Sequence, residues 1–111
     1  MITKTEIKKT ISEMKTMLKT IKIVQNEENN LYEELIISTA NKATELTKEI
    51  LETRETTGAA EEILTDRVKK IEWNVVTTES WGTNITFGKE VDVILDIKFL
   101  IEDIDMLILN K

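Results

Sequence analysis

Cysteine, histidine and proline do not occur in this chain of 111 residues. Without cysteine or histidine, the protein has no disulfide, no thiolate nucleophile, no imidazole acid–base group and none of the usual zinc ligands. A chain without cysteine fits a reducing compartment. The stretch Met1 to Val24 also lacks the uninterrupted apolar run of a signal segment, so we expect a cytoplasmic protein.

Turn-forming residues are scarce, because glycine occurs only at Gly58, Gly82 and Gly88. Few turns favour a small number of long elements. Hydrophobic residues make up 41% of the chain and charged residues 32%, which excludes a disordered chain and suits a helical domain. We expect residues 1–111 to form a single all-α domain, an antiparallel bundle of about four helices with an irregular or short β-hairpin insertion before the last helix.

The charge of the chain is unevenly distributed. The net charge is −6, yet the first 24 residues carry +4 and the remainder −10. An acidic body repels phosphate, which argues against general nucleic-acid binding. Acidic residues also interrupt the C-terminal apolar stretch too often for a membrane span. Lysine far outnumbers arginine, a composition typical of AT-rich genomes, which favours a phage or another mobile element as the source.

The C-terminal stretch Val91–Leu109 carries apolar residues on two faces of a predicted helix. A wide face of about 140° predicts the core: Val93, Ile94, Ile97, Leu100, Ile101, Ile104, Leu107 and Ile108. Leu95, Phe99 and Met106 form a narrow stripe on the far side. Its two edges are polar, with Asp92, Asp96 and Asp103 on one and Lys98, Glu102 and Asp105 on the other. The narrow stripe requires a cover, either from residues 74–87 or from a second copy of the chain. We expect a second copy, and therefore a homo-oligomer.

Residues 3–25 predict the first helix. Thr3 and Glu6 have the spacing of a capping box, and the apolar seam of a packed helix follows: Ile7, Ile11, Met14, Leu18 and Ile21. A ridge of lysines runs along one side of that seam and consists of Lys4, Lys8, Lys15, Lys19 and Lys22. We favour the interpretation that this lysine ridge is a solvated edge paired with acids of a neighbouring helix. The alternative is a docking site for an acidic partner or an anion.

The middle of the chain predicts two further helices. Residues 26–30 are rich in turn formers and predict the first turn. A second helix is expected over 30–57, with Gly58 directly after its end. A third helix is expected from Ala59 to at least Trp73.

The segment Asn74–Phe87 is rich in β-branched residues and has two interpretations. We favour a helix that continues to Thr78 and then a loop. The alternative is a hairpin in which residues 75–78 pair with residues 85–87 across a turn at 81–84. The aromatic residues Trp73, Trp81 and Phe87 either plug the end of the bundle or, in the case of an exposed Trp81, anchor a partner.

Carboxylates are the only candidate catalytic groups that the sequence suggests. Glu45, Glu49 and Glu52 share one face of the second helix, and Asp92 and Asp96 share one face of the last. Carboxylates that converge from two helices can bind Mg²⁺ in a bundle, because hard cations prefer oxygen ligands. A solvated acidic face explains the same spacing, and we favour that interpretation.

The segment Glu49-Ile-Leu-Glu52 resembles the first motif of the all-α nucleotide pyrophosphohydrolases of the MazG type. The resemblance implies Mg²⁺ and nucleoside triphosphate binding by this Glu-x-x-Glu pair and by a later Glu-x-x-Asp pair on another helix. One candidate for the second motif, Glu90 to Asp96, is out of register, because the residue three positions after Glu90 is Val93. The other candidate, Glu102 to Asp105, has the required spacing but lies late in the last helix.

The sequence therefore favours a non-enzymatic interaction or assembly module that acts by covering a partner protein. No catalytic residue, metal ligand or cofactor-binding residue is assigned. The candidate interface residues are Leu95, Phe99, Met106 and Trp81. The alternatives are the Mg²⁺-dependent pyrophosphohydrolase and an oligomer that sequesters an anion or nucleotide on the lysine ridge.

Overall fold

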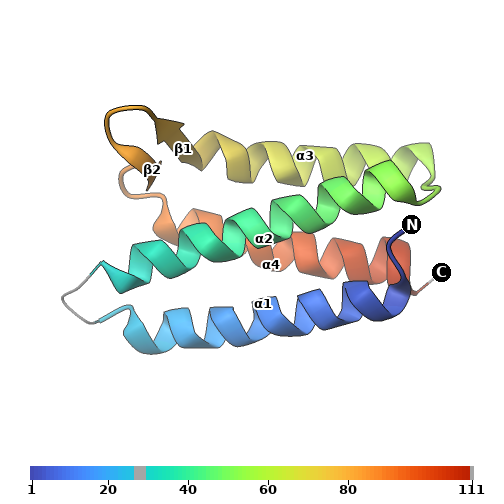
Figure 1. Cartoon of the computed structure of the whole chain (residues 1–111), viewed down its shortest axis with the longest axis horizontal. Helices are drawn as coiled ribbons and strands as arrows, with labels where there is room; N and C mark the ends of the chain where they lie inside the picture. The colour runs from blue at the N-terminus through green and yellow to red at the C-terminus, as the bar shows by residue number, and fades with distance from the viewer. Residues whose placement is uncertain (27–29, 111) are drawn as a thin grey trace.

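The protein folds as an antiparallel bundle of four helices with a two-stranded hairpin before the last helix (Figure 1). The structure is a computed structural model and describes residues 1–26 and 30–110. The elements are α1 (Lys4–Val24), α2 (Leu31–Thr53), α3 (Gly58–Asn74), β1 (Val75–Thr78), β2 (Gly82–Ile85), α4 (Glu90–Ile104) and a π-helical turn, η1 (Asp105–Leu109). The predicted fold class is confirmed. Most of the turn expected at 26–30 lies outside the described residues.

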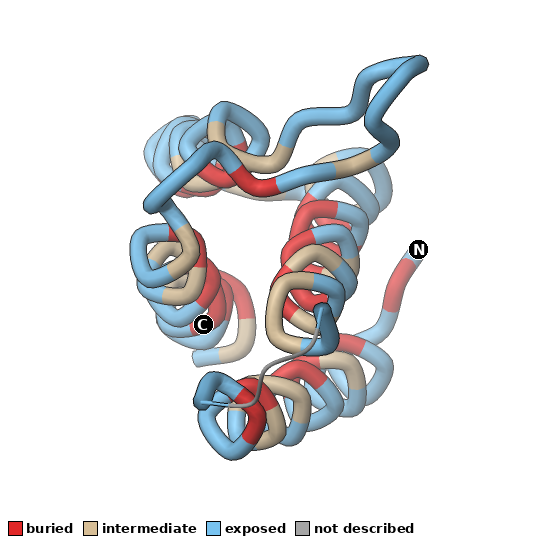
Figure 2. Tube along the Cα trace, turned by 90° about the vertical axis from the view of Figure 1, so that its left-hand side faces the viewer, coloured by how far each residue is buried: buried red, intermediate tan, exposed pale blue. Residues whose placement is uncertain are grey.

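Helix α2 is the centre of the packing. It contacts α1 on one side and α3 and α4 on the other, and α3 also packs on α4. Viewed end-on, α4 lies across the core from α2, while α1 and α3 flank them below and above (Figure 2). Close backbone contacts between α1 and α4 are few. Helix α4 therefore has an outer face bordered by α3 on one side and by α1 on the other.

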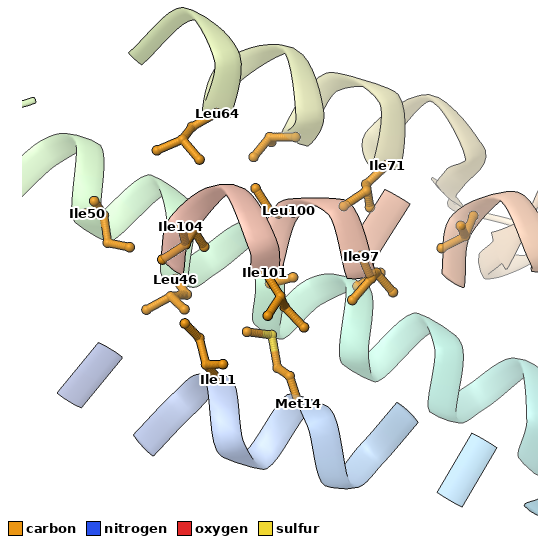
Figure 3. Packing of buried hydrophobic residues seen from close by; sticks show 14 of the residues in the cluster. Ile11, Met14, Leu46, Ile50, Leu64, Ile71, Ile97, Leu100, Ile101 and Ile104 are labelled. Atoms are coloured by element: carbon orange, nitrogen blue, oxygen red, sulfur yellow. The ribbon is translucent and has the colours of Figure 1, made fainter. Parts of the chain in front are cut away.

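The wide apolar face of α4 lies in the core, as predicted. Leu100 points towards Leu64 and Ile71 of α3, and Ile101 points towards Met14 of α1 (Figure 3). Ile97 and Ile104 have no exposed surface. Because this one face contacts three other helices, it holds the bundle together.

The first helix begins as its sequence predicts. The Thr3 hydroxyl accepts a hydrogen bond from the Glu6 backbone N–H at 3.1 Å. The same hydroxyl donates to the Glu6 carboxylate at 3.0 Å. The cap satisfies a backbone donor that the first turn of a helix otherwise leaves unpaired.

The second helix ends at Thr53, four residues earlier than predicted. Arg54 is extended, and its guanidinium donates to the Ile2 carbonyl at 2.9 Å, while the Thr53 hydroxyl accepts from the Ile2 N–H at 3.1 Å. The expected role of Gly58 is also wrong. Gly58 is the first residue of α3, and Thr57 caps that helix by accepting from the Ala60 N–H at 3.1 Å. Contacts with the N-terminus thus end α2 before the glycine is reached.

The insertion is the hairpin, so the interpretation of a helix followed by a loop is wrong. Val75 pairs with Ile85 and Thr78 with Gly82. The first strand lies where the hairpin alternative placed it. The second strand starts at Gly82, three residues earlier than that alternative placed it, and residues 79–81 connect the two strands. Gly82 has a φ of 69°, a conformation that costs glycine little because it has no Cβ. Ile85 is buried, and its N–H donates to the Glu33 carboxylate of α2 at 3.0 Å. Tertiary contacts thus fix the β conformation of this segment.

Candidate interaction surfaces

The narrow stripe on α4 remains partly exposed in the monomer. Leu95 is 43% exposed, Phe99 42% and Met106 66%, so residues 74–87 do not cover them. The hairpin instead projects from the end of the bundle beside α2 and α3 (Figure 2). The two polar edges of the stripe lie where the helical wheel places them. Asp96 and Asp103 lie towards α3, and Lys98 and Glu102 lie towards α1.

A hollow of about 540 Å³ lies between α3 and α4 on this side of the protein. Eight residues line it: Lys69, Lys70, Trp73 and Asn74 from α3, and Asp92, Leu95, Asp96 and Phe99 from α4. We call this surface the α3/α4 face. Trp73 is 82% exposed and, with Leu95 and Phe99, gives the face an apolar centre. Such a concentration of exposed large apolar side chains is typical of a binding surface.

The charges on the α3/α4 face are segregated by helix. Lys69 and Lys70 form a basic bank on α3, and Asp92 and Asp96 form an acidic bank on α4. Further along, Arg67 of α3 pairs with Asp103 of α4 at 2.7 Å. The Arg67 guanidinium also lies over the Phe99 ring, 5.0 Å from its centroid. Basic side chains of α3 therefore lie along one side of the face and acidic side chains of α4 along the other, where Asp92 is also paired with Lys89 at 3.4 Å.

The pKa of the Asp96 carboxyl is raised on this face. Burial raises the pKa of its carboxyl above the ordinary value, the positive charges of Lys70 and Arg67 oppose the shift, and the charge of Asp92 adds to it. A carboxylate in this position is incompletely stabilised by its own chain. An additional cation brought to the face would favour its charged form.

A second set of hollows follows the seam between α1 and α4. Three hollows of about 290, 410 and 360 Å³ lie in succession along it and share wall residues. Lys15 and Asp105 belong to the first and second, and Leu18, Lys19 and Lys98 to the second and third. We call this continuous depression the α1/α4 groove. It exists because α1 and α4 both pack on α2 but make few close contacts with each other.

The lysine ridge forms the α1 bank of this groove. Lys8, Lys15, Lys19 and Lys22 all line it, and Lys98 of α4 faces them. None of these lysines forms an ion pair with another residue in the described parts of the chain. The four lysines of α1 are exposed, as expected for a solvated edge, and Glu102 and Asp105 of α4 line the same groove without forming an ion pair with them. The ion pair from α1 to α2 lies elsewhere and joins Glu13 to Lys42 at 2.8 Å.

The aromatic residues do not plug the end of the bundle. Trp73, Trp81 and Phe87 are 82%, 81% and 99% exposed. Trp73 and Trp81 are equally exposed, so exposure alone does not favour one of them over the other as an anchor for a partner. The helical wheel contained the signal for Trp73, because it lies about 200° around the helix from the buried Ile71. The contributions of Trp73, Lys69 and Lys70 to the α3/α4 face were missed at the level of sequence.

The acidic residues proposed as metal ligands are dispersed. Glu45, Glu49 and Glu52 are exposed near the C-terminal end of α2, while Asp92 and Asp96 lie at the start of α4, at the other end of the bundle (Figure 1). Among residues 1–26 and 30–110, no group of three or more acidic side chains is arranged to hold a metal ion. The convergence that the pyrophosphohydrolase resemblance requires does not occur in this part of the chain.

None of the helices within the described residues combines the length and apolar character that a membrane crossing requires. Comparison with protein-family models, with curated proteins and with solved structures finds no match for this chain.

Proposed function

We propose that this protein is a small non-enzymatic interaction and assembly module, and that the α3/α4 face is the surface through which two copies associate. The observation that supports this most directly is the exposure of Trp73, Leu95 and Phe99 around one hollow. Covering a large apolar side chain contributes about 1.5–3 kcal/mol when its burial is complete. Trp and other aromatic residues also dominate binding energies at interfaces.

The segregation of charge selects one arrangement of the two copies. A two-fold axis parallel to the helices places α3 of one copy against α4 of the other. Lys69 and Lys70 then lie opposite the partner's Asp92 and the partner's Asp96. An axis across the helices would instead bring α3 against α3 and place the lysines of both copies together. The first arrangement is favoured because like charges in contact are costly and opposite charges fix the register.

The size of the face sets the expected strength of the dimer. Two helices of about 25 Å, each about 10 Å across, present a projected area of roughly 500 Å². Standard stable interfaces bury about 800 Å² on each partner. We therefore expect a reversible dimer whose population depends on protein concentration in the micromolar range.

Light scattering over a concentration series tests this proposal, with 12.8 kDa as the mass of one chain. The mass is expected to rise towards twice this value, and Phe99→Glu is expected to hold it at one chain. Ile23→Glu is the matched control, because Ile23 is 73% exposed on α1 and lies outside both surfaces. A wild-type protein that stays monomeric at high micromolar concentration would contradict the proposal.

Charge reversal tests the arrangement itself. K69E/K70E and D92K/D96K each place like charges opposite one another, so each variant alone is expected to be monomeric. An equimolar mixture is expected to form a heterodimer, because every contact between the two variants then joins opposite charges. If Phe99→Glu disrupts the dimer but the mixture does not associate, the face is correct and the axis is wrong.

A further inference from the structure

The α1/α4 groove has the dimensions of a helix-binding site. It runs beside α1 from Lys8 to Lys22, which is about 21 Å at 1.5 Å per residue. Leu18, Ile94 and Leu109 are partly exposed along its floor, and the buried side chains of Ile11, Ile21 and Ile101 lie beneath them. A long apolar depression between two helices is the surface that receives the apolar side of a third helix in helix-in-groove recognition.

The banks of the groove specify the charge of the occupant. The α1 bank is basic throughout, from Lys8 to Lys22. The α4 bank is basic at Lys98 and becomes acidic at Glu102 and Asp105. An occupant therefore needs acidic residues along its α1-facing edge. On its other edge it needs an acid near Lys98 and a base near Glu102 and Asp105.

We propose that the α1/α4 groove binds an amphipathic acidic helix of a partner protein. The apolar side of this helix covers the floor, and its carboxylates face Lys15, Lys19, Lys22 and Lys98. These lysines have no ion-pair partner in the described parts of the chain, so binding does not require an existing pair to break. This inference does not rest on the proposed dimer, because the groove lies on the α1 side of α4, although Leu95 borders both surfaces.

Two other anionic partners fit the groove less well. Nucleic acid presents phosphates along its whole length, and Glu102 and Asp105 would repel them at one end. The floor is also apolar, whereas a phosphate backbone offers it nothing to bury. An anionic membrane surface is flat, whereas these apolar residues lie in a depression between two helices.

A fluorescent peptide is the direct probe. The peptide has about 18 residues, or roughly 27 Å of helix, with leucine at helical spacing and glutamate and lysine on its edges as the banks require. Fluorescence polarisation with the full-length protein is expected to show saturable binding that weakens as salt is raised. A second peptide with glutamate and lysine exchanged is the matched ligand control, and it is expected to bind at least about tenfold more weakly.

The affinity of the peptide for charge-reversal variants tests whether it binds in the groove. K19E/K98E reverses one charge on each bank and is expected to weaken binding about tenfold or more. K9E/K48E changes the net charge equally on exposed residues outside the groove and is expected to stay within about twofold of wild type. Unchanged thermal unfolding of K19E/K98E shows that the variant is folded. Amide chemical-shift changes caused by the peptide are expected along α1 and the α1 side of α4.

Several results would overturn the proposal. One is an exchanged peptide that binds as well as the designed one. Another is equal loss of binding in K19E/K98E and K9E/K48E. Shift changes confined to α3 and the hairpin would place the peptide elsewhere. Binding of duplex DNA or of vesicles containing phosphatidylserine that K19E/K98E abolishes, with no peptide binding, would assign the groove to that partner instead.

Discussion

Arg67 and Asp103 join α3 to α4, with the guanidinium Nε 2.7 Å from the carboxylate Oδ2. Both side chains are more than two-thirds buried, and the same guanidinium lies over the Phe99 ring. This contact sets the relative position of the two helices that carry the α3/α4 face. The pair follows the charge pattern of the face, in which α3 contributes the basic residue and α4 the acidic residue.

A double-mutant cycle is expected to show that this pair is coupled. Arg67→Met and Asp103→Asn are each expected to lower the free energy of unfolding, with a coupling energy of about 1 kcal/mol or more, because a partly buried charged hydrogen bond exceeds a solvated one. The matched control is Lys48 with Glu72, 3.5 Å apart and more than half exposed. Its cycle is expected to give less than about 0.5 kcal/mol in denaturant titrations. Equal coupling in the two pairs would contradict this assignment.

Two hairpin residues, one buried and one exposed, are expected to differ in their contribution to the free energy of unfolding. Ile85→Ala removes a buried side chain and is expected to cost about 2–4 kcal/mol of unfolding free energy. Trp81→Ala removes a larger side chain that is 81% exposed, so it is expected to cost less than about 0.5 kcal/mol. Chemical denaturation of both variants makes the comparison. A large loss in Trp81→Ala would show that the tryptophan packs against the protein.

Two glycines are expected to respond oppositely to alanine. Gly82 has a φ of 69°, so Gly82→Ala strains the backbone, and a loss of about 1 kcal/mol is expected. Gly58 lies in the first turn of α3 without a positive φ, and a Cβ built there meets no atom within 4 Å. Gly58→Ala is therefore expected to stabilise the protein by about 0.4–1 kcal/mol, because it restricts the unfolded chain. Melting temperatures report both signs, and a destabilised Gly58→Ala would contradict the assignment of Gly58 to α3.

Asp96 is expected to make the stability of the monomer depend on pH. Its pKa in the folded protein is raised above the ordinary value of 3.8, so the folded state binds the proton more tightly than the unfolded state. Its contribution to stability is therefore complete below pH 3.8 and is lost as the pH rises through the raised pKa. Asp96→Asn is expected to gain stability relative to wild type as the pH rises through that range.

Denaturant titrations of wild type and Asp96→Asn over the acidic pH range measure this difference. Protein concentrations that give the monomer mass keep a partner's lysines away from the carboxylate. A difference between the two proteins that does not change with pH would contradict the shift. At concentrations that favour the dimer, the dependence is expected to diminish, because the partner's Lys69 and the partner's Lys70 favour the charged form of Asp96.

Helical periodicity was sufficient to predict the outer face of α4. Leu95, Phe99 and Met106 lie far around the helix from Ile97 and Ile104, so once α4 forms, the two sets cannot both be buried by the same neighbours. The Thr3 cap was predictable for a similar reason, because its partner is three residues away. The spacing of the lysine ridge was predictable too. Whether acids or open space lay opposite was not.

The hairpin could not be decided from local sequence, because a run of valine and threonine tolerates either conformation. Its partners are distant in the chain, since Ile85 donates to Glu33, 52 positions earlier. The end of α2 has the same kind of cause, because Arg54 turns away from helical geometry where it reaches Ile2. Contacts of this kind outweigh propensities of a few tenths of a kcal/mol per residue.

The sequence by itself determined four helices, their buried faces and the two polar edges of α4, because each follows from spacing along a single helix. Only the tertiary structure decided which helix lies beside each edge. Helix α3 brings Lys69, Lys70 and Trp73 to the Asp96 edge, and α1 brings its lysines to the Lys98 edge. The physical reason is that each surface is formed by two helices. A helical wheel describes one helix at a time and does not show which helix packs beside it.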